Sequence, residues 1–235
     1  AYRERLKTAY RELLELAERL VSRGYKLCRV VAEQISMDLE MLALDQELAV
    51  FLQRTEHVCG TARRRVLQGE QVPNGDKLFS LFEPHTQLYK RGKAGQPMQF
   101  GRQALVYEDD AGFVCHYFVL PREAQDCEVV VEQTRTVQDR LEGRIRTASF
   151  DRGFHSPDNQ TALAEIIAHP CLPMPGRKGQ HQAAHADVEF RRARQRHPGI
   201  ESAIGALQSG NGLARCRDRS EQGFMRYIGL GVLGR

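Results

Sequence analysis

The change of apolar spacing near residue 70 most constrains how this chain can fold. Before it, apolar side chains recur at steps of three or four residues, which is the spacing of an amphipathic helix. The first 24 residues carry Leu6, Ala9, Leu13, Ala17 and Leu20 at that spacing. Gly24 then predicts the C-terminal end of a first helix, and a second helical region is expected from about Met37 to Leu67. These residues predict an antiparallel helical pair that packs on something else, and no chemistry shows in it.

Beyond residue 70 the chain changes to a mixture of strands and helices. Pro, Asn and Gly in QVPNGDK, residues 71–77, mark the boundary. Two β-rich runs around residues 108–112 predict a hairpin, and a helix from about Ala124 to Glu142 follows it. RIRTASF is then a short strand, SPDNQTALAEIIAH a helix capped by Ser156, and HPCLPMPG a strand disturbed by prolines. Further helices are expected at 200–207 and over the last dozen residues. This order predicts a mixed α/β domain over 71–235, after a helical region over 1–70.

The cysteines, the lack of long apolar runs and the chain ends indicate what kind of protein this is. None of the six cysteines stands in a Cys-x-x-Cys pair, so no zinc site is predicted. The sequence has no signal peptide and no apolar run of about 18 residues, which favours a cytosolic protein with reduced thiols. Because the chain starts at Ala1 and ends at Arg235 inside an apolar pattern, we expect a fragment of a longer protein.

The basic residues are concentrated in the last third of the chain. The net charge of +4 permits a polyanionic partner without requiring one. Residues 176–196 hold six Lys or Arg against two acids, and residues 214–226 hold four Arg against two acids. For either run alone, a solvated helix face is the simpler interpretation.

The strongest candidate for chemistry is Asp151, in the stretch SFDRGFHS. It follows a short strand and precedes a helix, and ligands of open α/β sheets bind at that edge of the sheet. Mg²⁺ typically takes one or two carboxylates from a protein and fills its other positions with water and phosphate. For a lone Asp at such a turn, however, capping the helix is the simpler role.

A second carboxylate, Glu201, lies in the first turn of the helix that is predicted after Pro198 and Gly199. Acids are common there because they complement the helix dipole. The residues just before it include Arg191, Arg192, Arg194 and Arg196. Two carboxylates that can hold a metal ion, beside cations that can hold phosphates, are suited to phosphodiester chemistry.

Three stretches carry a further pattern: FSLFEPHTQLYKRGKAGQPMQFGRQALVYED, SFDRGFHS and HPGIESAIGALQSGNGLARCRDRSEQGFMRYIGLGV. In this order they resemble bacterial insertion-sequence transposases of the DDE type, over nearly the whole chain. The resemblance implies an RNase H-like mixed sheet flanked by helices, with an N-terminal helical insertion. It also implies DNA transposition, in which two Mg²⁺ (or Mn²⁺) ions on three carboxylates support DNA cleavage and strand transfer. By motif position, Asp151 resembles the second acid and Glu201 the third, so both are expected to be catalytic and to bind the metal.

The resemblance also implies partners and a location. The partners are DNA, as transposon ends and target, and further copies of the chain in a synaptic complex. The location is the bacterial cytoplasm, at the nucleoid. YKRGKAG, residues 89–95, resembles a phosphate-contacting loop of the family, although a flexible basic turn is equally compatible with it. The residues assigned to DNA contact are Arg91, Lys93, Arg177, Lys178, Arg196 and Arg215.

The chain departs from the family at three places. His197 stands where members typically have an Arg, and Gln208 stands where they often have a Lys; both changes weaken phosphate contact. The first catalytic Asp of the family lies on a strand before the helical region, so here it is expected upstream of residue 1. Substitutes within the chain would be Glu83, Asp76, Asp109 and Asp110. Glu83 is more simply a structural acid in a Pro-bounded turn, and the hairpin acids are more simply solvated.

Three hypotheses remain open on these grounds. The chain is an inactive or partial transposase, or a non-catalytic DNA-binding remnant of one. Alternatively, it is an unrelated α/β interaction domain in which Asp151 and Glu201 are helix caps. With one catalytic carboxylate lacking, the sequence leaves open whether the chain is an enzyme.

Overall fold

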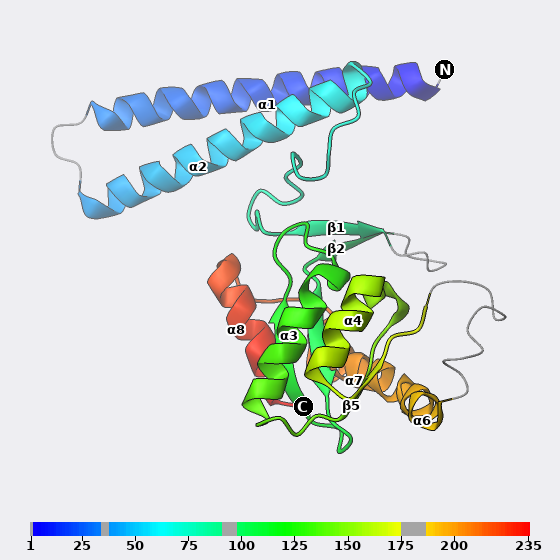
Figure 1. Cartoon of the computed structure of the whole chain (residues 1–235). Helices are drawn as coiled ribbons and strands as arrows, with labels where there is room; N and C mark the ends of the chain where they lie inside the picture. Colours follow the sequence, from blue (N-terminus) through cyan, green and yellow to red (C-terminus); the bar gives the residue numbers. More distant parts are fainter. Residues whose placement is uncertain (1, 34–37, 91–97, 175–186) are drawn as a thin grey trace. The chain divides into compact units, whose positions relative to one another are not determined.

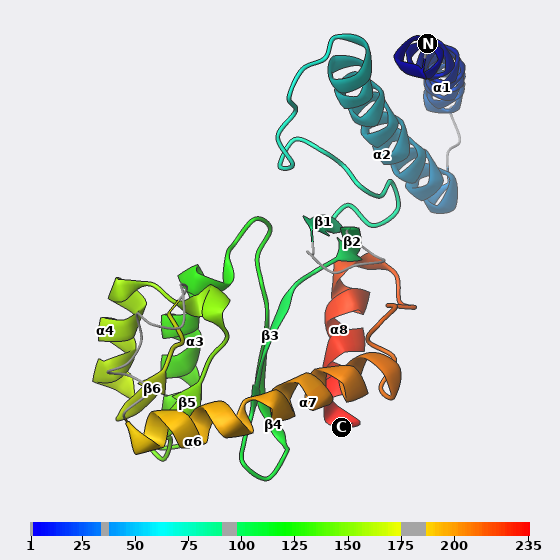
Figure 2. The same cartoon turned by 90° about the vertical axis from the view of Figure 1, so that its right-hand side faces the viewer.

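The computed structural model describes residues 2–33, 38–90, 98–174 and 187–235 (Figures 1 and 2). The chain divides into two compact units, Ala1–Gly101 and Arg102–Arg235. The first unit is mainly helical, and the second intersperses helices with short strands. The predicted mixed α/β class is therefore confirmed.

The first unit begins with a helical hairpin. Helix α1 (Tyr2–Ala32) packs along α2 (Leu39–Ala62), which continues into a π-helical turn, η1 (Arg63–Leu67). Asp38 caps α2, because its side chain accepts a hydrogen bond from the backbone N–H of Met41 at 2.7 Å. The helical pair predicted from the apolar spacing is confirmed.

The predicted end of the first helix at Gly24 is wrong, because α1 runs on to Ala32. Gly24 faces α2, and a Cβ atom at that position would lie only 2.4 Å from Cδ2 of Leu52. Leu52 is itself buried. Glycine is present here because the two helices approach closely, and not because the helix stops.

The segment after η1 folds back onto α2. Arg54 donates a hydrogen bond to the backbone oxygen of Leu81 at 2.8 Å, and the rings of Phe51 and Phe82 lie 5.3 Å apart between centroids. Strand β1 (Gln87–Lys90) then pairs antiparallel with β2 (Met98–Gly101). These contacts hold the segment to the helices, so the compact units separate at Gly101 and Arg102 and not at the composition change near residue 71.

The described residues of the second unit include four strands in two pairs. β3 (Ala104–Glu108) and β4 (Val114–Val119) form the predicted hairpin, and β5 (Thr147–Ser149) pairs in parallel with β6 (His169–Cys171). The helical elements are α3 (Asp126–Arg140), the 3₁₀ turn η2 (Arg152–Phe154), α4 (Pro157–Ile166), α6 (Val188–Arg196), α7 (Pro198–Ser209) and α8 (Ser220–Leu233). Ser156 caps α4 as predicted, since its Oγ accepts from the N–H of Asn159 at 3.0 Å.

The strands that the structure describes form three separate two-stranded sheets and not one mixed sheet. The parallel pair β5 and β6 is joined through η2 and α4, which is the usual βαβ crossover. The RNase H-like sheet implied by the family resemblance therefore stays a prediction.

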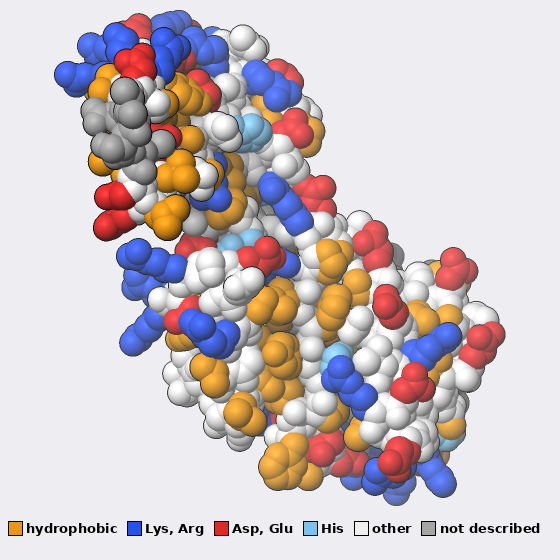
Figure 3. All heavy atoms as spheres, turned by 90° about the vertical axis from the view of Figure 1, so that its left-hand side faces the viewer, with side chains coloured by type: hydrophobic (Ala, Val, Ile, Leu, Met, Phe, Trp, Pro, Cys, Tyr) orange, Lys and Arg blue, Asp and Glu red, His pale blue; other side chains and the backbone are white. Residues whose placement is uncertain are grey.

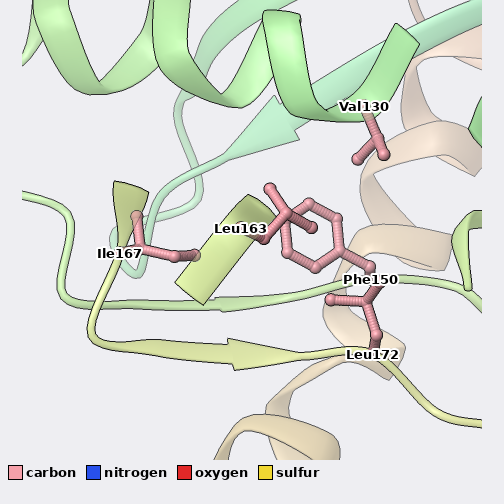
Figure 4. Packing of buried hydrophobic residues seen from close by; sticks show 5 residues of the cluster. All are labelled: Val130, Phe150, Leu163, Ile167 and Leu172. Atoms are coloured by element: carbon pink, nitrogen blue, oxygen red, sulfur yellow. The ribbon is translucent and has the colours of Figure 1, made fainter. Parts of the chain in front are cut away.

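A small apolar core fixes the backbone around Asp151 (Figure 4). It joins Val130 of α3, Leu163 of α4 and Ile167 to Phe150 and Leu172, which follow β5 and β6. All five side chains are buried. Because Phe150 immediately precedes Asp151, this core fixes the position of the backbone from which the Asp151 side chain extends.

A buried polar network joins the β3–β4 hairpin to α3. The hydroxyl of Tyr107 lies 2.8 Å from Oγ1 of Thr134, and burial raises the pKa of Tyr107 to about 12. Arg140 donates to Nδ1 of His116 at 2.9 Å, so Nδ1 is an acceptor and the ring proton sits on Nε2. Nε2 then donates to Oε1 of Gln133, also at 2.9 Å.

Candidate functional site

The side chain of Asp151 does not cap a helix. Asp151 follows β5 and begins η2, where its backbone oxygen accepts from the N–H of Phe154 at 3.2 Å. Its side chain makes no capping hydrogen bond to that turn. Instead, Oδ1 lies 2.8 Å from Nε2 of His197. The helix-cap role, which was the simpler sequence interpretation, is therefore not how this carboxylate is used.

His197 lies at the junction of two helices. Its backbone is helical, with φ −50° and ψ −37°, so α6 runs into α7 with little interruption (Figure 2). Only 11% of its side chain is exposed, against 71% for Asp151. A carboxylate can only accept a hydrogen bond, so Nε2 of His197 carries the ring proton and donates the hydrogen bond to Asp151. The imidazole thus holds an exposed carboxylate in one orientation.

A second contact ties the same helix to the same strand end. Nη1 of Arg194 donates to the backbone oxygen of Phe150 at 3.3 Å. Arg194 and His197 are three residues apart, so they lie on one side of the helix. Together they place α6 and the start of α7 against the carboxyl end of β5.

Glu201 lies one helical turn beyond His197. Residues four apart on a helix have Cβ atoms about 5–6 Å from each other. Glu201 is exposed and stands in the first turn of α7. Glu201 thus follows, one turn along the helix, the residue that contacts Asp151.

The cations predicted to contact DNA are only partly described. Arg196 ends α6, and its Nη1 lies 2.9 Å from Oδ2 of Asp110 at the tip of the β3–β4 hairpin. Both of these side chains are mostly exposed. Arg215 is exposed in the loop after α7. Arg91, Lys93, Arg177 and Lys178 lie outside the described residues.

The residue types at the site suit a hard divalent cation. Two carboxylates are what Mg²⁺ typically takes from a protein. Within the described ranges, no three His, Cys, Asp or Glu side chains come together as a metal-binding group. Asp151, His197 and Glu201 do not form such a group, and no other described residue completes one with either acid.

The acids considered as substitutes for the missing one have structural contacts. Oδ1 of Asp109 accepts from the N–H groups of Ala111 and Phe113, which shapes the hairpin turn. Glu83 lies 3.6 Å from His85 in a turn, and Asp76 lies 3.6 Å from Arg64. These contacts account for the three acids without any catalytic role.

Sequence reasoning missed the part that His197 plays. It was treated as a departure that weakens phosphate contact, whereas the structure gives it a hydrogen bond to Asp151. The two residues are 46 positions apart. No local pattern in a single sequence reports such a pairing.

Searches against protein families, curated proteins and solved structures each found no match. The transposase resemblance therefore rests on the motifs of this sequence alone. In the part of the chain that the structure describes, no helix has the length and apolar character needed to cross a membrane.

Proposed function

We propose that this chain carries a metal-dependent DNA-processing site of the DDE transposase type, within an RNase H-like domain. Asp151 and Glu201 would hold a divalent cation, Mg²⁺ or Mn²⁺. DNA, as transposon ends and target, is the proposed partner, with self-association in a synaptic complex. A bacterial cytoplasmic, nucleoid-associated location follows from that role.

The 2.8 Å hydrogen bond between His197 and Asp151 carries this proposal. Without it, a strand-end Asp and a first-turn Glu would be two unrelated acids. The bond links the end of β5 to the start of the helix that carries Glu201. Fixing the orientation of an exposed carboxylate is what a metal ligand requires of its neighbours.

Each residue of the site has a defined role. Asp151 and Glu201 supply oxygen ligands, and His197 positions Asp151 by donating from Nε2. A cation bound there would polarise a phosphodiester and lower the pKa of a bound water. Arg196 and Arg215 would hold the phosphate backbone, as would Arg91, Lys93, Arg177 and Lys178.

The expected activity is limited. Two acids in place of three give a weaker hold on paired metal ions, so we expect DNA binding with little or no strand transfer. The non-catalytic remnant is therefore a second candidate, favoured by the finding that no three His, Cys, Asp or Glu side chains form a metal-binding group among the described residues. Robust Mg²⁺- or Mn²⁺-dependent cleavage of a labelled DNA end, lost on Asp151→Ala, would contradict the limited activity.

DNA binding is measured by fluorescence anisotropy with a labelled duplex over a range of salt concentrations. Each lost phosphate contact lowers the slope of log K against log salt by about one. We expect that change for Arg196→Ala and for Arg215→Ala. Arg135→Ala, an exposed Arg on α3, is the matched control and should leave the slope unchanged. Equal slopes for all variants, or no binding at low salt, would refute the DNA-binding role. An α/β interaction domain without DNA affinity would then remain.

A further inference from the structure

Helix α1 has two apolar faces, and only one of them is covered by α2. The covered face consists of Tyr10, Leu14, Ala17, Val21, Gly24, Cys28 and Val31, all buried or half-buried. The other face consists of Leu6, Leu13, Leu16, Leu20, Leu27 and Val30, and each of these residues is between 38% and 59% exposed. This second face, the outer seam, extends over about 36 Å of helix at 1.5 Å per residue.

The outer seam cannot be reached by α2. At 3.6 residues per turn, its centre lies about 85° around the helix from the face that packs on α2. On α2, the segment that carries Leu81 and Phe82 packs against Arg54 and Phe51, whereas Leu39 and Leu44 near the start of the helix are exposed. Figure 3 shows hydrophobic side chains at the surface of the helical unit, with Lys and Arg side chains along its top.

The spacing of the outer seam is that of a coiled coil. Leu6, Leu13, Leu20 and Leu27 recur every seven residues, and Leu16 and Val30 lie three residues after two of them. This alternation of three and four is the 3.5-residue period of helices that pair along their length. A solvated helix face has no reason to keep that period with leucine. The seam therefore fits another helix.

We propose that the outer seam is covered by α1 of a second copy of this chain, running antiparallel. In the favoured register, Leu16 meets Leu20 of the partner, and Leu6 meets its Val30. Leu27 packs on Ala9 of the partner. Leu13 meets Arg23, whose aliphatic stem can lie over it while the charge reaches water.

The charges beside the seam select this register. The column that precedes the heptad leucines contains Arg5, Glu12, Arg19 and Lys26, and Glu33 extends it. In an antiparallel pair this column faces its own copy. The favoured register sets Glu12 against Lys26 of the partner and Arg5 against its Glu33, and the two-fold axis makes each pair twice. The one like pair is Arg19 with itself at the axis.

Shifting the register by one heptad removes this complementarity. In one direction Arg5 meets Lys26, which offsets the attraction of Glu12 for Arg19. In the other direction Glu12 meets Glu33 and Arg19 meets Lys26. Like charges placed opposite one another reject wrong alignments in helical pairs. Both the apolar contacts and the charges thus favour the same self-pairing, which does not depend on whether Asp151 and Glu201 bind a metal.

Sedimentation equilibrium of the 235-residue chain tests the pairing. We expect a dimer for the wild type and a monomer for Leu16→Glu/Leu20→Glu, with helix content by circular dichroism unchanged because both side chains are exposed. Leu44→Glu, an equally exposed leucine on α2, is the matched control and should stay dimeric. The proposal is overturned if the wild type is monomeric up to about 100 µM. That result is expected if the second unit or a lipid covers the seam. A dimer that survives the double substitution also overturns the proposal.

Charge reversal tests the register. Lys26→Glu turns two attractive pairs repulsive and should weaken dimerisation roughly tenfold, and so should Glu12→Lys. The double variant Glu12→Lys/Lys26→Glu restores both pairs with their signs exchanged, so it should regain most of the wild-type affinity. The antiparallel register would be refuted if the single variants dimerised as tightly as the wild type. It would also be refuted if the loss of dimerisation free energy in the double variant equalled the sum of the losses in the two single variants.

Discussion

The core behind Asp151 makes a quantitative prediction for Leu163→Ala. Leu163 has no exposed surface and packs in the cluster of Val130, Phe150, Ile167 and Leu172. The substitution removes three carbon atoms, worth about 0.8 kcal/mol each when buried, or about 2.4 kcal/mol in transfer free energy. The cavity left behind adds to this, because surrounding side chains relax only partly. We expect the second unit to lose about 3 to 4 kcal/mol of unfolding free energy.

The assay is urea unfolding with hydrogen exchange read peptide by peptide. Peptides of α3 and α4 should lose protection at lower urea in Leu163→Ala, while peptides of α1 and α2 should not change, because they belong to the other compact unit. Leu233→Ala is the control, since Leu233 is 83% exposed and should cost little. A loss below about 1 kcal/mol for Leu163→Ala would refute the assigned core, because a buried Leu→Ala costs more than that. An equal loss for Leu233→Ala would do the same.

Three further predictions concern packing and ionisation. Gly24→Val should lower the stability of the first unit by about 1 to 3 kcal/mol, because Leu52 lies close to Gly24. Gly60→Ala should raise that stability by about 0.5 to 1 kcal/mol, because the space around Gly60 is open. Two variants of equal stability would contradict this packing. Burial raises the pKa of the Cys171 thiol from 9.0 to about 11, so the unfolded chain ionises first. The free energy of unfolding is therefore unaffected by this thiol below pH 9 and falls by about 2 kcal/mol as the pH rises to 11. Urea unfolding at pH 8 and at pH 10.5 should show a smaller fall in stability for Cys171→Val than for the wild type. An equal fall in stability in Cys171→Val would contradict the raised pKa of Cys171. Nitrogen chemical shifts should show His116 with its proton on Nε2, and a proton on Nδ1 would be inconsistent with the Arg140 hydrogen bond.

Local patterns predicted most of the elements. The three- and four-residue apolar steps indicated α1 and α2, and the alternating runs around residues 108–112 indicated the β3–β4 hairpin. Ser156 was identified as a cap because capping depends on neighbouring residues only. Gly24 was misjudged because a glycine that ends a helix and one that admits a neighbouring helix look alike in sequence.

The contacts that build the site could not be predicted in the same way. Asp151 and Glu201 were singled out from local position, yet the His197 hydrogen bond depends on how α6 packs against β5. Likewise, the register of the β5–β6 pair is set by α4 and its core, which joins residues far apart in sequence. The outer seam of α1 was visible as apolar spacing, but only the packing of α2 shows that it is left uncovered.

The most direct test of the central claim is to ask where a bound divalent cation lies. Fe²⁺ can replace Mg²⁺ at oxygen sites, and with ascorbate and peroxide it cuts the backbone beside its ligands. We expect cuts near residues 151 and 201 only, suppressed by excess Mg²⁺ and abolished by Asp151→Asn or Glu201→Gln. Asp139→Asn, an exposed acid on α3, should leave the cuts unchanged. Cuts elsewhere, or cuts that persist in Asp151→Asn, would show that these two acids do not share a metal ion.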